Sequence, residues 1–249
     1  MDAAMFEPSL AHLPAPKPVP RAPEATAAFG DAAVVIWNDV EAEGVEEFYR
    51  WHDHEHIPER LGLPGFLRGR RYVRPGHSPA WLTVYEADSL DAVTSPEYLA
   101  RLNEPTPATM SALRHFRKTS RAICALLCTV GSSTGGAMLS LRIDMPDACI
   151  GDFAQAVHEE LFPAAMAVNG VLACHLYLSD QWASHANTTE SSTRSFDVPT
   201  AVLLLEATSE AAAEAARRLI QGPAMERFGV VVRPDAAVYQ LEICRLAQC

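Results

Sequence analysis

The sequence predicts an α+β fold of two tandem ferredoxin-like (βαββαβ) repeats, packed sheet to sheet within one chain as a barrel-like pair. Three observations carry this prediction. The order β-α-β-β-α-β can be followed twice along the 249 residues. The two halves also match residue by residue at a constant offset. Finally, a single four-stranded sheet of this kind exposes one apolar face, which a second repeat can cover.

The first repeat, residues 30–130, follows from its hydrophobic runs and their period. Apolar or alternating runs predict strands, and segments with helical spacing predict helices, which Pro105 and Pro107 interrupt. The expected strands are Ala32–Trp37, Phe66–Val73, Trp81–Tyr85 and Ala122–Val130, and the expected helices are Gly44–Leu61, Leu90–Leu102 and Pro107–Phe116.

The second repeat, residues 137–249, shows the same order. Its expected strands are Ala137–Ile143, Val171–Leu178, Ala201–Glu206 and Val238–Cys244, with helices over Ile150–Val168 and Glu210–Leu219. An offset of 105 residues places Glu55 on Glu160, Pro58 on Pro163, Gly65 on Gly170, Leu67 on Leu172 and Tyr72 on Tyr177. Five matches at one offset indicate a covalent repeat.

Two segments fall outside the repeats, and one lies within the second. Residues 1–29 are rich in Ala and Pro, which predicts an extended arm. Residues 131–136, rich in Gly and Ser, predict a flexible linker. Glu86 and Glu206 match at an offset of 120, so the second half has gained about 15 residues, which we place in Ser179–Asp197. Its composition is that of a loop, which is either a lid over a pocket or an idle surface excursion.

Composition excludes several classes of protein. A net charge of -11 disfavours partners such as nucleic acid or an anionic membrane. No apolar run is long enough to span a bilayer, and no secretory signal is visible. The six cysteines show no CxxC spacing, so we interpret them as free thiols of a reducing compartment, which predicts a cytoplasmic protein.

The segment Trp51–Glu59 concentrates three histidines and three carboxylates in nine residues. Read as an α-helix, it places Phe48, His52 and His56 on one inward face, with Glu55 and Glu59 beside them. The same spacing directs Ile57 outward, and Pro58 is expected to kink or end the helix. At the shifted positions stand Val157 and Leu161, so we expect a polar pocket only in the first half.

One string of residues resembles a known family. Trp51, followed by Glu55-His56-Ile57-Pro58-Glu59, Pro64-Gly65-Phe66 and Arg70-Arg71-Tyr72, resembles the EthD-like branch of the dimeric α/β-barrel superfamily. The string covers about a tenth of the chain, and the second half keeps less of it. The resemblance implies the fold and a pocket between the sheet and its helices. The superfamily includes cofactor-free isomerases and cyclases, monooxygenases and haem-binding proteins, so the resemblance leaves the reaction open.

The histidine helix supplies the candidate catalytic residues. His56 can act as a base or acid near neutral pH, with His52 as a second candidate. Glu55 is expected to orient the imidazole or to serve as the base itself. For each histidine the alternative is a residue packed in the core, hydrogen-bonded to the backbone.

Four further residues are candidates for substrate binding. Arg70 and Tyr72 share one face of their strand, where a cation and a phenol could hold a carboxylate or enolate oxygen. For Arg71, on the other face, we expect surface ion pairs. Asn38 ends the first strand and either caps a loop or reaches the pocket mouth, and Phe48 lies on the face that carries the histidines.

The sequence does not favour a metal or other cofactor. His52 and His56 have the i, i+4 spacing of a zinc-binding pair, but no well-spaced third ligand is evident. We therefore expect an enzyme that needs no cofactor: a lyase, isomerase or cyclase that abstracts a proton from a small aromatic or carbonyl-bearing metabolite. A haem- or small-ligand-binding module without catalysis is the alternative, and a degenerate structural protein is a third. A homodimer of the tandem chain is also open.

Overall fold

The computed structural model describes residues 30–193 and 197–248, so the predicted arm over residues 1–29 lies outside the described part. Within it the strands are β1 (Ala32–Val40), β2 (Phe66–Val73), β3 (Trp81–Ala87), β4 (Phe116–Gly131), β5 (Ala137–Asp144), β6 (Val171–Ser179), β7 (Ala201–Ala207), β8 (Val231–Val232) and β9 (Ala237–Leu246). Each predicted strand is present, and most extend by one or more residues.

Helices fill the connections between strands. They are α1 (Val45–Trp51), α2 (Ile57–Leu61), α3 (Pro96–Asn103), α4 (Pro107–Leu113), α5 (Ile150–Ala156), α6 (Phe162–Met166), α7 (Gln181–Ser184), α8 (Glu210–Ile220) and α9 (Pro223–Glu226). Short 3₁₀ turns are η1 (Ala42–Gly44), η3 (Ala92–Thr94), η4 (Asp147–Cys149) and η6 (Thr189–Thr193). The helix expected over Leu90–Leu102 is divided into η3 and α3, because Ser95 caps a new helix that begins at Pro96.

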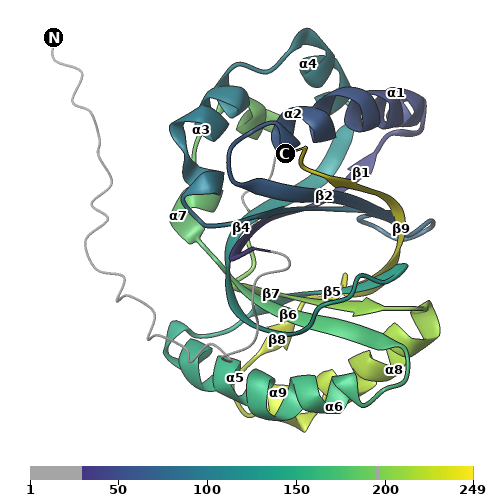
Figure 1. The fold of residues 1–249 in the computed structure, drawn as a ribbon, viewed down its shortest axis with the longest axis vertical. Helices are drawn as coiled ribbons and strands as arrows, with labels where there is room; N and C mark the ends of the chain where they lie inside the picture. The colour runs from purple at the N-terminus through teal and green to yellow at the C-terminus, as the bar shows by residue number, and fades with distance from the viewer. Residues whose placement is uncertain (1–29, 194–196, 249) are drawn as a thin grey trace, which may run out of the picture.

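Eight strands form a closed antiparallel barrel in the order β7-β6-β4-β1-β3-β2-β9-β5, which β5 closes by pairing with β7. The 16-residue strand β4 pairs with β1 along one part and with β6 along the other, and β2 pairs with β9. These two pairings join the halves. Helices α1 to α4 cover one side of the barrel and α5, α6, α8 and α9 the opposite side (Figure 1). The predicted α+β class and barrel are confirmed.

Both long helices contain a π-helical turn at the same place in their half. The turns are η2 (His52–His56) and η5 (Val157–Leu161), again 105 residues apart. In each, a backbone N–H bonds five residues back, and a proline follows within two residues. The wider turn changes which side chains face inward. Ile57, expected outside, is fully buried, and the helix runs past Pro58 to Leu61.

The barrel interior is mostly apolar and contains a charged cluster. The apolar side chains include Val35, Trp37, Leu82, Val84 and Leu204. Among them Arg70 donates to Glu86 at 2.6 Å and to Glu206, and all three are fully buried. Arg68 also binds Glu86, and Tyr72 contacts Arg70. The cluster carries two positive and two negative charges, so its members compensate one another.

The segment between the halves is fastened to this cluster. The hydroxyl of Thr134 accepts a hydrogen bond from Arg68 at 2.6 Å, and the backbone N–H of Gly135 donates to Glu206 at 3.0 Å. A side chain at Gly135 would collide with the carbonyl oxygen of Ala207, its Cβ lying 2.0 Å away. The glycine predicted to give a flexible linker therefore serves close packing here.

His175, in the same interior, is expected to make the protein less stable in mild acid. Burial lowers its pKa to about 4, although Glu86 opposes the shift. The unfolded chain, with a histidine pKa near 6.5, therefore binds more protons than the folded one between about pH 6.5 and 4. Stability should fall by roughly 3 kcal/mol as pH drops through this window. Urea unfolding at several pH values measures this, and the slope should flatten in His175→Gln. An unchanged slope would contradict the assignment.

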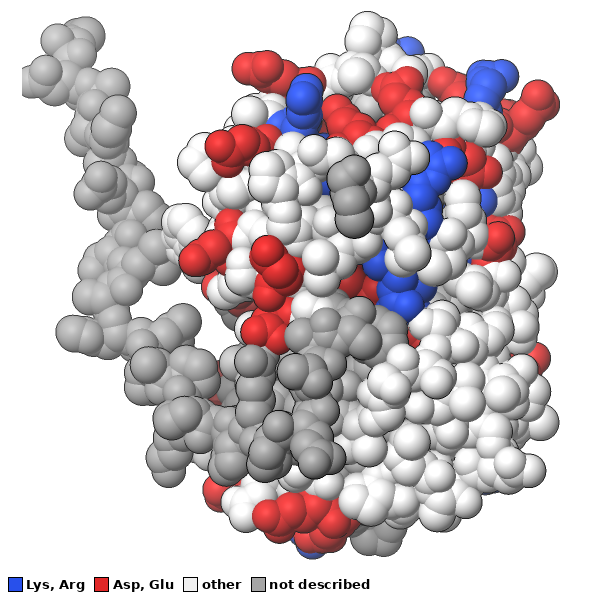
Figure 2. Space-filling model, viewed as in Figure 1, with Lys and Arg blue, Asp and Glu red and all other residues white. Residues whose placement is uncertain are grey.

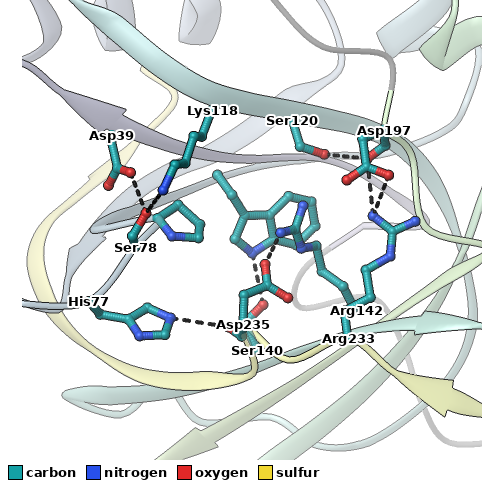
Figure 3. A network of polar contacts seen from close by, with 12 residues as sticks. Asp39, His77, Ser78, Lys118, Ser120, Ser140, Arg142, Asp197, Arg233 and Asp235 are labelled. Atoms are coloured by element: carbon teal, nitrogen blue, oxygen red, sulfur yellow. Dashed lines mark hydrogen bonds and ion pairs between the residues drawn. The ribbon is translucent and has the colours of Figure 1, made fainter.

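A second polar network closes one end of the barrel (Figure 3). Trp37 donates to the hydroxyl of Ser140 at 3.0 Å, and Arg142 pairs with Asp235. Arg233 binds Asp144 at 2.7 Å and Asp197 at 2.9 Å. These contacts join strands of both halves and fix the end of the loop Ser179–Asp197.

The described surface carries charges of both signs, and the described cysteines are free thiols. Acidic and basic side chains are interspersed over the upper half of the face in Figure 2, and few charged side chains appear at its lower right. The cysteines in the described part are free, and burial raises the pKa of Cys124, Cys128 and Cys174 to about 12, so these thiols are neutral. None of the described helices is long and apolar enough to cross a membrane.

Candidate functional site

A cavity of about 50 Å³ lies between the helices of the first half and the outer face of the barrel. Its floor comes from alternating residues of three adjacent strands: Ile36 and Asn38, Thr83 and Tyr85, and Thr119 and Arg121. Its walls come from the helices and from η6. The lining residues from these are Phe48, Trp51, His52, His56, Arg60, Tyr98, Leu102, Leu113, Phe116 and Glu190.

His52 is held as a neutral imidazole. Its Nδ1 lies 3.0 Å from Nη1 of Arg71, and a guanidinium can only donate, so Nδ1 accepts. Burial lowers the pKa of His52 well below its usual value, and the charges of Arg71 and Arg60 lower it further. The single ring proton therefore sits on Nε2, 3.2 Å from the hydroxyl of Tyr85. His52 thus donates to Tyr85 and is a poor base.

The hydrogen bond from His52 determines how the hydroxyl of Tyr85 is directed. Its hydroxyl oxygen accepts the proton of His52, which leaves its own proton available to another acceptor. Burial raises the pKa of Tyr85, so the phenol stays protonated. Because Tyr85 lines the cavity, its O–H can donate to an oxygen of a bound molecule. No sequence signal pointed to this residue, because a tyrosine in a buried strand cannot be told from other aromatic residues of the core.

His56 lies beside Tyr85 and has a carboxylate within reach. Its ring packs against that of Trp51 in a tilted arrangement, with centroids 4.3 Å apart, and the centroid of the Tyr85 ring is 6.2 Å away. Its Nδ1 is 4.0 Å from a carboxylate oxygen of Glu59, whose pKa burial raises. The expected neighbour, Glu55, instead accepts from the hydroxyl of Thr106 and does not line the cavity. The orienting role expected of Glu55 therefore fits Glu59 better.

Asn38 and Phe48 line the cavity, whereas Arg70 and Tyr72 do not. In the β2–β3 register Arg70 is opposite Val84 and Tyr72 is opposite Leu82, and both partners lie in the barrel interior. The expectation that Arg70 and Tyr72 border the pocket of His56 is corrected. Alternation sorted the β2 residues into two faces, but only strand pairing shows which face meets the helices.

Arg71, expected in surface ion pairs, is the β2 arginine that meets the helices. It is 2% exposed and binds Asp53, Glu242 and His52. Its guanidinium also lies 4.4 Å from the centroid of the Tyr49 ring. Arg71 therefore fixes the tautomer of His52 from behind the cavity.

The loop gained by the second half reaches this cavity in the first half. Glu190, on η6, binds Arg60 at 2.6 Å, and both side chains are buried. Thr189 donates to the backbone carbonyl of Asn103, at the end of α3. The described part of Ser179–Asp197 is thus a wall of the cavity, which favours the covering role over an idle excursion.

The corresponding region of the second half is packed with apolar side chains. Val157 and Leu161, which replace His52 and His56, are buried with Phe153 and Phe162. These two positions therefore contribute apolar packing in the second half and line the cavity in the first half.

In the described part of the chain, metal ligands do not gather around the histidine pair. Among the described residues, the one group of three potential ligands within reach of one another is Glu41, Glu43 and His115, near the surface. His52 already binds Arg71 and Tyr85 through its two ring nitrogens, so it has no lone pair left for a metal.

No protein-family model matches the sequence, and comparison with curated proteins also gives no match. Solved structures do match. An anthrone oxidase-like protein aligns with a TM-score of 0.57 at 14% identity, over 87% of this chain and 92% of its own. A chlorite dismutase from Candidatus Nitrospira defluvii gives 0.55 at 12%, over 87% and 92%. A candidate monooxygenase from Lactobacillus acidophilus gives 0.50 at 13%, over 87% and 96%. These proteins belong to one superfamily.

The chain has the dimeric α/β-barrel fold. Because the identities are so low, this likeness concerns the arrangement of strands and helices and not the chemistry. In this dimeric α/β-barrel chain, both sheets of the barrel come from one polypeptide, and the cavity lies between the outer sheet face and the helices of the first half.

Proposed function

We propose that this protein is an enzyme without a cofactor, a lyase, isomerase or cyclase that abstracts a proton next to the carbonyl of a small metabolite. The single observation that carries the proposal is the Tyr85 hydroxyl. Its oxygen is occupied by His52, so its proton is directed to a further acceptor in a cavity that His56 also lines. A phenol donor beside an imidazole is the pair that enolate formation requires.

In the proposed step, the imidazole of His56 removes a proton from the carbon next to the carbonyl. The C–H electron pair forms a C=C bond, and the carbonyl oxygen takes up the negative charge. Tyr85 donates to that oxygen, and Glu59 stabilises the imidazolium. Return of the proton from His56 to the same or another carbon completes an exchange or an isomerisation, so no further reactant is needed.

The cavity volume favours this function over the haem-binding alternative. A space of about 50 Å³ accommodates a few water-sized groups, far less than the several hundred Å³ typical of sites for drug-sized ligands or cofactors. A small ligand carrier would use the same cavity but would not need a base beside the phenol.

We also infer that the two halves are tandem ferredoxin-like repeats of the EthD-like branch. Two observations support the repeat. Both halves show the strand order fourth-first-third-second, β4-β1-β3-β2 and β9-β5-β7-β6. Their π-helical turns also stand at the offset that aligns Pro58 with Pro163.

The experiment is hydrogen–deuterium exchange. The full chain is incubated in D₂O with a panel of small ketones, aldehydes and oxo acids, and exchange next to the carbonyl is followed by NMR. Tyr85→Phe should slow the exchange by roughly 10²–10³ fold, because one donor to the enolate oxygen is lost. Tyr239→Phe, which removes a buried hydroxyl in the barrel interior, is the matched control. Equal rates in Tyr85→Phe and the wild type, or no exchange with any compound, would refute the proposal.

A further inference from the structure

Arg121 differs from the other buried arginines. It lies on β4, is 5% exposed and lines the cavity. Arg60, Arg68, Arg70 and Arg71 each bind at least one carboxylate. In the part of the chain that the structure describes, no side chain forms an ion pair with Arg121, and its buried Nε has no hydrogen-bond partner.

The surroundings of Arg121 compensate its charge only partly. The guanidinium of Arg121 lies 5.8 Å from the centroid of the Tyr98 ring. The guanidinium of Arg60 lies 5.6 Å from the same centroid. A cation–π contact replaces a fraction of the hydration that a buried guanidinium loses. Arg60 adds a second positive charge nearby, but Glu190 and Glu59 bind it. A buried arginine with five N–H donors, and with no carboxylate partner among the described residues, can bind an anion from outside the chain.

We propose that Arg121 anchors the carboxylate of the substrate, so that the substrate class is a small oxo acid. The inference rests on the proposed function for the carbonyl, and on Arg121 for the carboxylate. A planar carboxylate matches the two parallel N–H bonds that a guanidinium offers. One arginine without a carboxylate partner balances one negative charge, which fits a carboxylate better than a doubly charged phosphate. The apolar walls, Phe48, Leu102, Leu113 and Phe116, suit a short carbon skeleton.

The arrangement assigns one group of the substrate to each polar residue of the floor and wall. Arg121 binds the carboxylate, Tyr85 donates to the carbonyl oxygen, and His56 faces the carbon between or beside them. All three residues line the same cavity. An oxo acid therefore enters with its charge fixed at one end and its reacting carbon placed by the other two contacts.

The test measures binding and does not depend on turnover. Pyruvate and acetoacetate are titrated calorimetrically into the full chain, beside their neutral counterparts pyruvamide and acetone, and beside inorganic phosphate. Arg121→Gln should weaken binding of the carboxylates about 10- to 100-fold and leave the neutral compounds unchanged. Arg121→Lys keeps the positive charge but loses the two parallel N–H groups. Its affinity for the carboxylates should therefore lie between those of the wild type and Arg121→Gln. Arg218→Gln removes an exposed arginine and is the matched control.

A melting curve separates an anchor from a structural residue. Without ligand, Arg121→Gln should melt at or above the wild-type temperature, because a buried charge without a carboxylate partner is removed. A lower melting temperature, or a variant that does not fold, would assign Arg121 a structural role and overturn the inference. Tighter binding of phosphate than of carboxylates, or equal binding of pyruvate and pyruvamide, would also overturn it. Carboxylate binding that depends on Arg121 without any exchange would uphold the anchor and refute only the proposed reaction.

Discussion

Replacing Arg70 with Met is expected to destabilise the protein by about 3–5 kcal/mol, the cost of breaking a buried ion pair by removing one partner. Arg70, Glu86 and Glu206 are all fully buried, so the substitution leaves two carboxylates in the barrel interior with Arg68 as the remaining cation. Urea unfolding at neutral pH measures the change in the free energy of unfolding.

The double variant Arg70→Met, Glu206→Gln is the control for this prediction. It removes one charge of each sign, so it should recover a large part of the lost stability if uncompensated charge is the cause. If Arg70→Met alone unfolds at the wild-type urea concentration, the charged cluster does not hold the two halves of the barrel as described.

Replacing His56 with Ala or with Asn is expected to lower the rate of proton exchange by roughly 10²–10⁴ fold, the usual contribution of a general base. The reason is specific to His56. Arg71 and Tyr85 occupy both ring nitrogens of His52, whereas His56 lines the cavity within reach of Glu59. Exchange is measured by NMR in D₂O and folding by circular dichroism on the same samples.

His54, an exposed histidine of the same π-helical turn, supplies the matched control for that loss. His54→Asn should keep the wild-type rate. A His56 variant that stays folded and keeps full exchange would remove His56 from the mechanism. A variant that unfolds would show that His56, packed against Trp51, is a core residue.

Much of the fold could be predicted because its signals are local. The period and length of the hydrophobic runs placed the strands of the barrel, and the offset between Gly65 and Gly170 is the basis of the proposed repeat. The helix that carries the histidines was also expected, but the set of residues predicted to face inward was partly wrong. A π-helical turn widens the helix at His52–His56, and this turn buries Ile57. Ideal α-helical spacing cannot show such a change.

The candidate site was predicted less completely than the fold. His52, His56, Asn38 and Phe48 line the cavity, whereas Arg70 and Tyr72 lie in the barrel interior. Tyr85 and Arg121 were not identified. Tyr85 stands in a strand of mostly large hydrophobic residues and Arg121 follows a run of other polar residues in β4, so neither position stands out in the sequence. The sequence also offers no signal that separates a ligand-binding arginine from one in an ion pair.

By itself the sequence determined the order of the elements and the segment that carries the histidines. These depend on contacts between residues close in the chain. The tertiary structure alone decided which face of β2 meets the helices, that Glu190 crosses from the second half to Arg60, and that Arg121 has no carboxylate partner in the described part of the chain. Each of these depends on segments that are far apart in sequence, and their side chains acquire a charge environment only when the barrel closes.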